Sequence, residues 1–416
     1  MLRARLVSRI RRARREGPRR TSAGLVRKLG SLLLGMALFP LSVVGHFLGY
    51  RRITFITQRI GHLAAEPDSF LKAQALGELP RRRWFFLAPP GEVANEHLLS
   101  YWTQWIRAVR SPFACYLLQA MSTLGLMRFD AGRYVLWLDH SQEVYRLNTA
   151  WSSRAPLLSL NKDDVAWSDP MFRAIGLPEG AWFACIHVRE GGFSPYDEDA
   201  HSHRNGSIEA LLPAVQEIIR RGGWCVRMGD PTASTFPPVA GVIDYAHHAL
   251  RQARLDVCLC ARARFFLGNT SGIALVSTVF GVPSAMANMV PASCLGMLPS
   301  DLNIFKLHRR KRDGRILHFR EIFNSPTANF RYAYQYEREG LEVIENTGDE
   351  IRELACEMLD RLDGRFAPDD CDDDVQARFR SLLKPGDYGY YASSRVGAAF
   401  LKRHAGLLMQ GPGSGY

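Results

Sequence analysis

The sequence has 416 residues, of which 47% are hydrophobic and 23% are charged. These proportions are typical of folded globular proteins and exclude a chain that is disordered throughout. The length allows two α/β domains with appendages. The formal net charge is +12, but eleven arginines or lysines against one glutamate fall within residues 1–28. Because this basic arm lacks interleaved aromatic residues and the remainder is nearly balanced, we do not expect nucleic acid as a partner.

The eight cysteines include no CxxC pair, and several of them lie inside apolar runs. The spacing of Cys258 and Cys260 is poor for a tetrahedral metal site. Free cysteine in an apolar run behaves as a small buried hydrophobic residue. We therefore expect a reducing compartment and no structural zinc.

Residues 29–50 form an apolar segment in which His46 is the one basic residue, and pairs of basic residues flank both ends. The length is sufficient to span a bilayer. Pro40, four glycines and the basic flanks favour instead a segment that re-enters the membrane or lies on it beside anionic lipids. No signal-peptide pattern is evident. Residues 1–50 are thus predicted to be a basic arm and a membrane-associating segment, with a buried first helix as the alternative.

Residues 51–165 have the pattern of a first α/β domain. Apolar and β-branched runs predict strands at residues 51–57, 84–87 and 134–138. A helix that includes residues 69–75 follows the first strand. A second helix begins at Asn95 and carries aromatic residues that suit a buried face.

Residues 168–180, with two prolines and Gly176, predict a joint before a second α/β domain at residues 180–365. Its expected strands begin at Trp182, Trp224, Val242 and Phe265. Its expected helices cover residues 207–221, 249–261, 273–280 and 349–362, and Thr347 with Glu350 gives the last of them a capping-box pattern. An acidic run and a glycine-rich end predict a flexible C-terminal tail at residues 366–416.

Three of the expected strands end in polar or glycine residues. These residues are His187, Arg189 and Glu190 after the first; Arg227, Gly229 and Asp230 after the second; and Gly268, Asn269, Thr270, Ser271 and Gly272 after the third. In an open α/β sheet, ligands sit beyond the carboxyl ends of the strands. Arginines beside a glycine-rich turn that opens a helix therefore predict an anion pocket, most simply for a diphosphate.

The turn at residues 268–272 offers backbone N–H donors and two hydroxyls where the helix dipole favours negative charge. It is neither a Walker loop nor a GxGxxG turn, so NAD is not expected as a cofactor. The alternative interpretation is an ordinary N-cap, in which Thr270 or Ser271 satisfies the first helical turn.

Arg189 is the favoured diphosphate ligand, because its planar guanidinium donates two parallel hydrogen bonds. Glu190 is a candidate general base, or an ion-pair partner of Arg189 or Arg204. His187 is a candidate base or a positioning residue. Asp197 and Asp199 form a literal DxD pattern, but they follow the strand end by several residues, and no metal site is predicted.

Further candidates lie at the other strand ends. Arg227, Asp230, Asp244 and Tyr245 are candidates for donor binding, since an aspartate there accepts from ribose hydroxyls or a base edge. A helix cap or an ion pair is the alternative for these aspartates. The candidates for the acceptor side are Gly61, His62 and Asn95 in the predicted first domain.

The motifs His187-Val188-Arg189, Arg227 to Asp230, Asp244 to Ala246 and Phe266 to Gly272 occur in this order. They stand between Arg59-Ile60-Gly61-His62-Leu63 and Ile344-Glu345-Asn346-Thr347. Together, over residues 51–363, they resemble a family of bacterial glycosyltransferases from surface-carbohydrate gene clusters. That family is distantly similar to the protein O-fucosyltransferases and α-1,6-fucosyltransferases, which have a GT-B-like fold and a His-x-Arg motif.

This resemblance implies that Arg189 binds the donor diphosphate and helps it to leave without a metal. It implies donor-phosphate binding by Thr270, Ser271 and Gly272. In this chain Glu190-Gly191-Gly192 stands where the fuller fucosyltransferase motif has a second arginine and an aspartate.

The combined interpretation is an α/β protein with a GT-B-like fold, in which two Rossmann-like domains face a cleft. The expected reaction transfers a sugar from a nucleotide-diphosphate donor to a membrane-linked or surface-polysaccharide acceptor, without cofactor or metal. The alternatives are a nucleotide-sugar epimerase or hydrolase of the same fold and a non-catalytic polysaccharide-assembly protein. Because such a donor is cytosolic, we expect a peripheral or monotopic protein on the cytoplasmic face of the bacterial inner membrane.

Overall fold

The computed structural model describes residues 29–134, 136, 142–191, 195–368 and 371–409, and the chain forms two compact units. The first unit comprises residues up to 57, 80–93 and 102–131, and the second comprises residues 58–79, 94–101 and 132 onward. The predicted first domain, residues 51–165, therefore contributes segments to both units. The predicted domain boundaries themselves stay a prediction.

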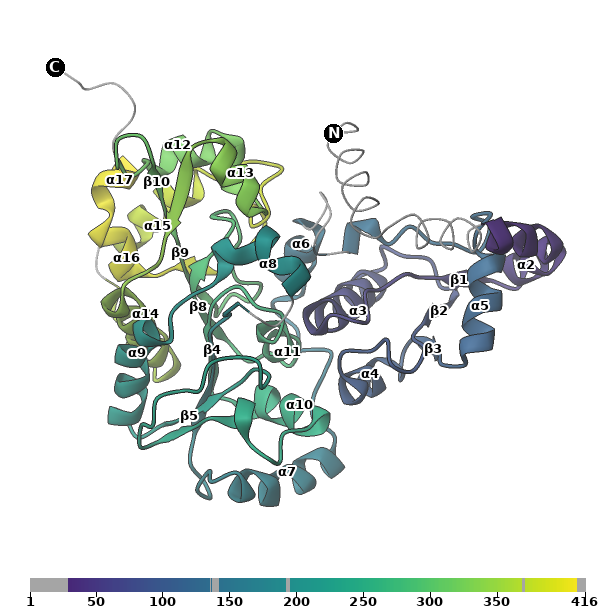
Figure 1. The fold of residues 1–416 in the computed structure, drawn as a ribbon, viewed down its shortest axis with the longest axis horizontal. Coiled ribbons are helices and arrows are strands. Elements are labelled where there is room, and N and C mark those ends of the chain that lie inside the picture. Colours follow the sequence, from purple (N-terminus) through teal and green to yellow (C-terminus); the bar gives the residue numbers. More distant parts are fainter. Residues whose placement is uncertain (1–28, 135, 137–141, 192–194, 369–370, 410–416) are drawn as a thin grey trace. The chain divides into compact units, whose positions relative to one another are not determined.

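The first unit contains a three-stranded parallel sheet in the order β1-β2-β3. Its strands are β1 (Tyr50–Arg52), β2 (Arg83–Leu87) and β3 (Arg107–Val109). Its helices are Leu29–Ala37, α2 (Phe39–Phe47) and α5 (Pro112–Met121) (Figure 1). Trp84 meets Phe129 edge to face at 5.1 Å between ring centroids, and Phe86 is fully buried, so the small sheet has an aromatic core.

The apolar N-terminal segment forms two short helices. Among the described residues, no single helix has both the length and the apolar character needed to cross a membrane. The helices Leu29–Ala37 and Phe39–Phe47 meet these criteria only together, as a pair bent by 63°.

A seven-stranded sheet forms the centre of the second unit, in the order β12-β9-β8-β7-β4-β5-β6. Its strands are β4 (Phe183–His187), β5 (Trp224–Arg227), β6 (Val242–Ile243), β7 (Phe265–Gly268), β8 (Ser284–Met289), β9 (Leu302–Phe305) and β12 (Arg395–Val396). Every neighbouring pair is parallel. The strands are almost continuously apolar, because a parallel sheet is covered on both faces. This architecture confirms the predicted α/β class.

Helices cover both faces of this sheet. Figure 1 shows α9 (Ile208–Arg220) and α14 (Gly348–Leu362) together on one face, and α10 (Ala253–Arg262) and α11 (Ala274–Val279) on the other. The predicted capping box at α14 is confirmed, since Thr347 accepts from the backbone N–H of Glu350 while the Glu350 carboxylate accepts from that of Thr347.

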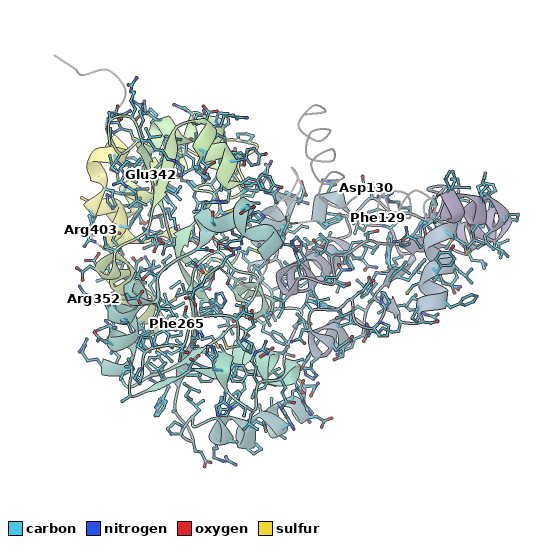
Figure 2. The ribbon with its side chains drawn as sticks, viewed as in Figure 1. Phe129, Asp130, Phe265, Glu342, Arg352 and Arg403 are labelled. Atoms are coloured by element: carbon cyan, nitrogen blue, oxygen red, sulfur yellow. The ribbon has the colours of Figure 1, made fainter. Side chains whose placement is uncertain are left out.

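Smaller elements complete the second unit. They are α3 (Ile60–Ala75), α4 (Glu96–Trp102, whose last residue belongs to the first unit), α6 (Gln142–Trp151), α7 (Lys162–Ala174), α8 (Pro195–His201), α12 (Phe319–Phe323), α13 (Ala333–Arg338), α15 (Asp372–Arg380), α16 (Ala398–Arg403) and α17 (Ala405–Met409). An antiparallel pair joins β10 (Leu307–Arg310) to β11 (Leu341–Ile344). In Figure 2, Phe265 lies inside the unit, where it is fully buried, whereas Arg352 and Arg403 lie at its edge.

Several predicted elements have different limits in the structure. The strand expected at residues 51–57 forms only at Tyr50–Arg52, while β3 has no counterpart among the predictions. The strand expected at residues 134–138 begins in a 3-10 turn, Gly132–Tyr134, and its remainder lies largely outside the described residues. The helix expected from residue 249 begins at Ala253. Short irregular elements such as these are decided by packing rather than by local pattern.

The prediction of a flexible tail is wrong for residues 371–409, which form α15, β12, α16 and α17. Strand β12 pairs with β9 at the edge of the sheet, and Phe379 and Phe400 lie 5.6 and 5.2 Å from Phe305 between ring centroids. Asp372 is buried and forms an ion pair of 2.7 Å with Lys402 instead of facing water. The aromatic residues therefore outweigh the acidic run in deciding the structure of this segment.

Candidate active site

The predicted strand ends meet at one edge of the sheet in the second unit. Ile186 of β4 pairs with Arg227 of β5 and with Leu267 of β7, and His187 pairs with Gly268. A Cβ at Gly268 would lie 2.6 Å from the carbonyl oxygen of His187, so a larger residue would separate the two strands. The first and third predicted motifs are therefore neighbours, as expected.

Asn269 holds Arg189 beside residues 201–205, a segment that was not predicted to belong to the site. Its Oδ1 accepts from the backbone N–H of Arg189 at 2.8 Å, and its Nδ2 donates to the carbonyl of Arg204 at 3.2 Å. The Arg189 guanidinium donates to the carbonyl of His201 at 3.1 Å and to the Asn205 side chain. Because Asn269 is buried, it fixes the backbones of both arginines together.

Arg204 is the site residue that sequence reasoning missed. Its Nη2 donates to the carbonyl of Thr270 at 2.8 Å. Burial, followed by the nearby charges of Arg189, Arg59 and Arg331, lowers the pKa of Arg204 to about 10. Among the described residues no carboxylate pairs with Arg204, and its Nε has no hydrogen-bond partner. Arg204 therefore brings a half-buried positive charge to the site that no described carboxylate balances.

The turn after β7 supplies further polar groups. The hydroxyl of Thr270 accepts from the backbone N–H of Val290 at 3.2 Å and faces the sulfur of Met289 at 3.6 Å. The hydroxyl of Ser271 is buried and has no hydrogen-bond partner among the described residues. Helix α11 has Ile273 at its N-cap and no side-chain cap, so the alternative in which Thr270 or Ser271 caps this helix is wrong.

His187 is neutral at neutral pH. Burial, and then the positive charge of Arg227, lower its pKa to about 4. Its Nδ1 is buried without a hydrogen-bond partner among the described residues. An imidazole with so low a pKa is a weak base, and this geometry favours the predicted positioning role over the predicted catalytic one.

Arg227 lies in a buried ion-pair network, and its predicted contact with the donor is not supported. Its side chain donates to Glu190 at 2.9 Å and to Asp244 at 3.2 Å, and the residue is 1% exposed. Glu190 also accepts from the backbone N–H of Ser234 at 3.2 Å. The ion pair expected for Glu190 therefore forms with Arg227 rather than with Arg189 or Arg204. This network ties the ends of β4, β5 and β6 together.

Three more donor-side candidates have internal partners. Asp230 accepts from the N–H and the hydroxyl of Thr232 at 2.8 and 2.5 Å, which closes a turn. Gly229, before it, has φ +146° in the region that favours glycine, and its carbonyl accepts from the Nε of Arg251 at 3.0 Å. Tyr245 is fully buried and donates to Asp256 at 2.9 Å, and burial raises its pKa. These contacts support structural roles for the three residues.

Of the three acceptor-side candidates, Gly61 packs against the turn after β7, whereas His62 and Asn95 have internal partners. A Cβ at Gly61 would lie 2.7 Å from the Cα of Gly272, so the start of α3 packs directly on the turn after β7, within the second unit. The Nδ1 of His62 forms a hydrogen bond of 2.6 Å with the carboxyl group of Glu66, which is buried. Asn95 accepts from Leu98 at 2.8 Å and donates to the carbonyl of Ala253 at 2.9 Å. Asn95 therefore caps α4 and tethers it to α10, which leaves its predicted acceptor role unsupported.

Two further groups from distant segments join the site. Lys306 is buried and donates to the carbonyl of Asn205 at 2.7 Å, and burial lowers its pKa. His203 packs on Tyr336 at 5.3 Å between ring centroids, and burial lowers its pKa to about 3. No local pattern marks either residue, because folding alone brings them to the strand ends.

The DxD pattern lies in α8, where Asp199 is exposed and Glu198 is half-buried. Glu198, between the two aspartates, accepts from the Nδ2 of Asn205 at 2.6 Å. Within the part of the chain that the structure describes, no three His, Cys, Asp or Glu side chains gather as a metal site requires.

No protein-family profile matches the chain, and no curated protein matches its sequence. Among solved structures, ADP-heptose LPS heptosyltransferase II of E. coli is 14% identical and covers 57% of this chain and 84% of its own, with a TM-score of 0.39. The dodecameric iron-containing heptosyltransferase TibC in complex with ADP-D-beta-D-heptose is 12% identical, covering 58% of each chain with a TM-score of 0.35. The E. coli heptosyltransferase WaaC with ADP is 12% identical and covers 62% of this chain and 91% of its own, with a TM-score of 0.32. TM-scores below 0.5 assign no function, so the functional conclusion rests on the residues of this chain.

Proposed function

We propose that this protein is a glycosyltransferase whose second unit binds a nucleotide-diphosphate sugar at the ends of β4 and β7. The observation that carries the proposal is Arg204, a half-buried cation with no carboxylate partner among the described residues, which lies beside Arg189. Burying a cation is costly unless an anion or hydrogen bonds compensate for it. A diphosphate has the charge and the acceptor oxygens to compensate more than one arginine.

The chemistry requires stabilisation of a leaving group. In sugar transfer, the bond between the anomeric carbon and the β-phosphate oxygen breaks, and negative charge develops on that oxygen. The oxygen of the acceptor hydroxyl forms the new bond to the anomeric carbon, and its proton passes to the departing diphosphate or to water. Guanidinium groups held in place before the reaction stabilise the developing charge without reorganisation. Arg189 is held in this way by Asn269 and Asn205, and the Ser271 hydroxyl offers another donor.

We include metal independence in the proposal, because the arginines supply positive charge at the place where a metal would otherwise act. The role of Arg189 is also the one that the fucosyltransferase-like motif implies, although the proposal specifies no donor sugar. Glu190 is engaged by Arg227, so we assign it to holding the strand ends. The start of α3 is proposed to serve the acceptor.

The proposed acceptor is a glycan or lipid-linked glycan at the membrane. The apolar helices Leu29–Ala37 and Phe39–Phe47 support an attachment to the cytoplasmic face of the inner membrane, where nucleotide sugars are available. Protease accessibility in intact and permeabilised cells tests this topology. Digestion of the second unit in cells with an intact inner membrane but a permeable outer membrane would contradict it.

Donor binding is tested by thermal shift with a panel of nucleotide diphosphates and their sugars. A ligand at about 100 times its Kd should stabilise the protein by about 2.7 kcal/mol. Arg189→Ala and Arg204→Ala should abolish this stabilisation. Arg309→Ala should retain it, because Arg309 is half-exposed and pairs with Glu342 on the antiparallel β10–β11 pair.

Product analysis with a labelled donor tests the reaction itself. The proposal predicts label in a glycosylated acceptor that depends on Arg189. Release of free sugar would instead identify the reaction as hydrolysis, and formation of an epimer of the donor would identify it as epimerisation. Binding without turnover across the full set of donors and acceptors would favour a non-catalytic assembly protein.

A further inference from the structure

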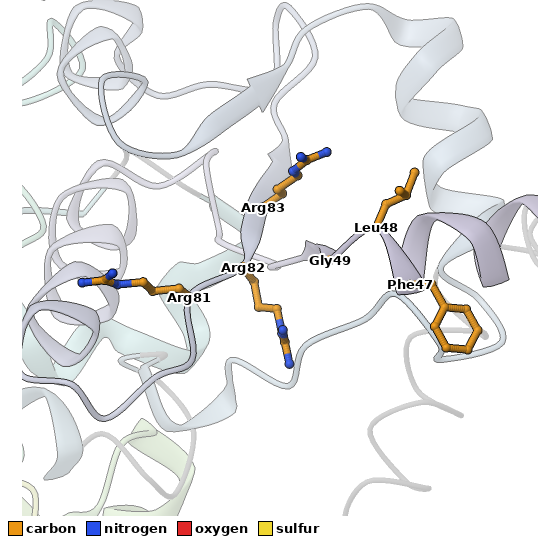
Figure 3. A pocket seen from close by; sticks show the side chains of 6 residues that line it. All are labelled: Phe47, Leu48, Gly49, Arg81, Arg82 and Arg83. Carbon is orange, nitrogen blue, oxygen red and sulfur yellow. The ribbon is translucent and has the colours of Figure 1, made fainter.

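The surface of the first unit combines exposed apolar residues with a row of arginines. A cavity of about 430 Å³ lies where α2 ends, and it is lined by Phe47, Leu48, Gly49, Arg81, Arg82 and Arg83. In Figure 3 the three arginine side chains spread in different directions around the turn, with the two apolar side chains beside them. Apolar and cationic groups therefore share one shallow surface.

The apolar helices present their large residues outward. Small residues face α5, since a Cβ at Gly35 would lie 2.6 Å from the carbonyl oxygen of Ala120, and Ser42 donates to the carbonyl of Met121 at 3.1 Å. By contrast, Phe47 is 83% exposed and Leu33 is 62% exposed. This packing holds the bent helix pair against α5 and leaves the apolar face of the pair exposed.

Helix α5 extends the same kind of surface, because its residues Phe113 and Tyr116 are 72% and 48% exposed. Exposed apolar residues in such number are characteristic of membrane or protein contact surfaces. The arginines beside these apolar residues decide whether the surface contacts a membrane or a protein.

The arginines are held at the end of the apolar helix by the backbone. Gly49, with φ +81°, turns the chain from α2 into β1, and its carbonyl accepts from the N–H of Arg83 at 2.9 Å. Arg83 also stacks on the Tyr50 ring at 5.3 Å. Among the described residues, neither Arg81 nor Arg82 pairs with a carboxylate. Positive charge is therefore available at the level where an inserted apolar helix would leave the bilayer.

We propose that the surface around the cavity at the end of α2 binds anionic phospholipids, whose headgroup phosphates pair with Arg81, Arg82 and Arg83 while Phe47 and Leu48 contact the acyl chains. A lipid is the occupant that satisfies both halves of this surface, since its phosphate matches the arginines and its chains match the apolar residues. The inference deepens the proposed membrane attachment and does not depend on the transfer reaction.

The test is co-sedimentation of the full chain with vesicles, in the absence of donor and acceptor. Wild type should prefer vesicles containing phosphatidylglycerol over vesicles of phosphatidylcholine alone. An arginine near a membrane surface contributes about fivefold to affinity, so R81Q/R82Q/R83Q should lose roughly 100-fold for the anionic vesicles. The charge-preserving variant R81K/R82K/R83K should retain most of the preference.

Arg107→Gln is the matched control, because Arg107 is an exposed arginine on β3 of the same sheet. It should bind as wild type does, and circular dichroism melting should find all variants folded. Unchanged binding of the triple glutamine variant would overturn the proposal and assign the preference to the basic arm. Equal binding of wild type to both vesicle types would overturn it too.

Inorganic phosphate distinguishes a lipid from a free anion. The proposal predicts that inorganic phosphate at about 1 mM gives no arginine-dependent thermal stabilisation, since an isolated phosphate lacks the apolar contacts. Arginine-dependent stabilisation by inorganic phosphate, with vesicle binding unaffected, would assign the cavity to a soluble anion. A failure of glycosyl transfer would leave these vesicle measurements unchanged, so the two proposals fail separately.

Discussion

Replacing Arg204 by methionine should separate stability from ligand binding. Partial burial lowers its pKa to about 10, and at about 1.36 kcal/mol per pKa unit this lowering corresponds to a cost of roughly 3 kcal/mol for the charged form. The substitution also removes the hydrogen bond to the Thr270 carbonyl, and a bond with a charged donor contributes about 1.5–3 kcal/mol. The net change in the free energy of unfolding should therefore lie between zero and a gain of about 2 kcal/mol.

The sign of the pH dependence follows from the same shift. The folded state disfavours the cation, so the cost of the charge is present in full below pH 10 and is relieved only as the pH rises above about 10. At neutral pH an anionic ligand can offset this cost in wild type. The variant should therefore lose the stabilisation by nucleotide diphosphates that wild type gains.

Urea unfolding without ligand and thermal shift with ligand measure the two quantities. Arg227→Met provides the contrast, because it leaves the carboxylates of Glu190 and Asp244 without their cationic partner. It should lower the free energy of unfolding by about 3–5 kcal/mol. A loss of more than about 2 kcal/mol in Arg204→Met, together with intact nucleotide stabilisation, would refute the assignment of Arg204 to an anion site.

Three further predictions concern packing, metal and pH. Gly61→Ala should cost about 1–3 kcal/mol in urea unfolding, because its Cβ would lie 2.7 Å from the backbone of Gly272, whereas Gly30→Ala has open space and should be near neutral. An equal effect of both would contradict this packing. Transfer should persist in excess EDTA. Inhibition that magnesium or manganese reverses would indicate a metal site, for which residues 197–199 are the candidates. Burial lowers the pKa of His308 to about 4, so its contribution to stability, present above pH 6.5, is lost as the pH falls from 6.5 to 4. His308→Gln should therefore remove about 2 kcal/mol of the stability difference between pH 7 and pH 5, and an unchanged difference would count against that shift.

The sequence was sufficient to predict the parallel sheet and the meeting of two strand ends. Apolar runs that close with His187, Arg189 and the turn at residues 268–272 carry that information locally. The position of Arg189 beside Asn269 follows from the strand pairing alone.

The partners of the charged residues could not be predicted in the same way. Arg227 at a strand end has the same local pattern whether it faces a ligand or two carboxylates, and its partners Glu190 and Asp244 lie 37 and 17 residues away. Arg204 and Lys306 join the site from elements that no strand motif marks. Long-range packing, rather than residue type, decides which basic side chains remain available to bind an anionic ligand.

The edge strand β12 has a consequence for how the chain folds during synthesis. Strand β9 and Phe305 are made long before the segment that pairs with and covers them, so the nascent sheet has an open edge and an exposed aromatic cluster. Open edges and uncovered aromatic residues favour association between unfinished chains. Translation that stops before Arg395 should therefore yield aggregates, and the cell would need a chaperone to hold this edge until the last strand arrives.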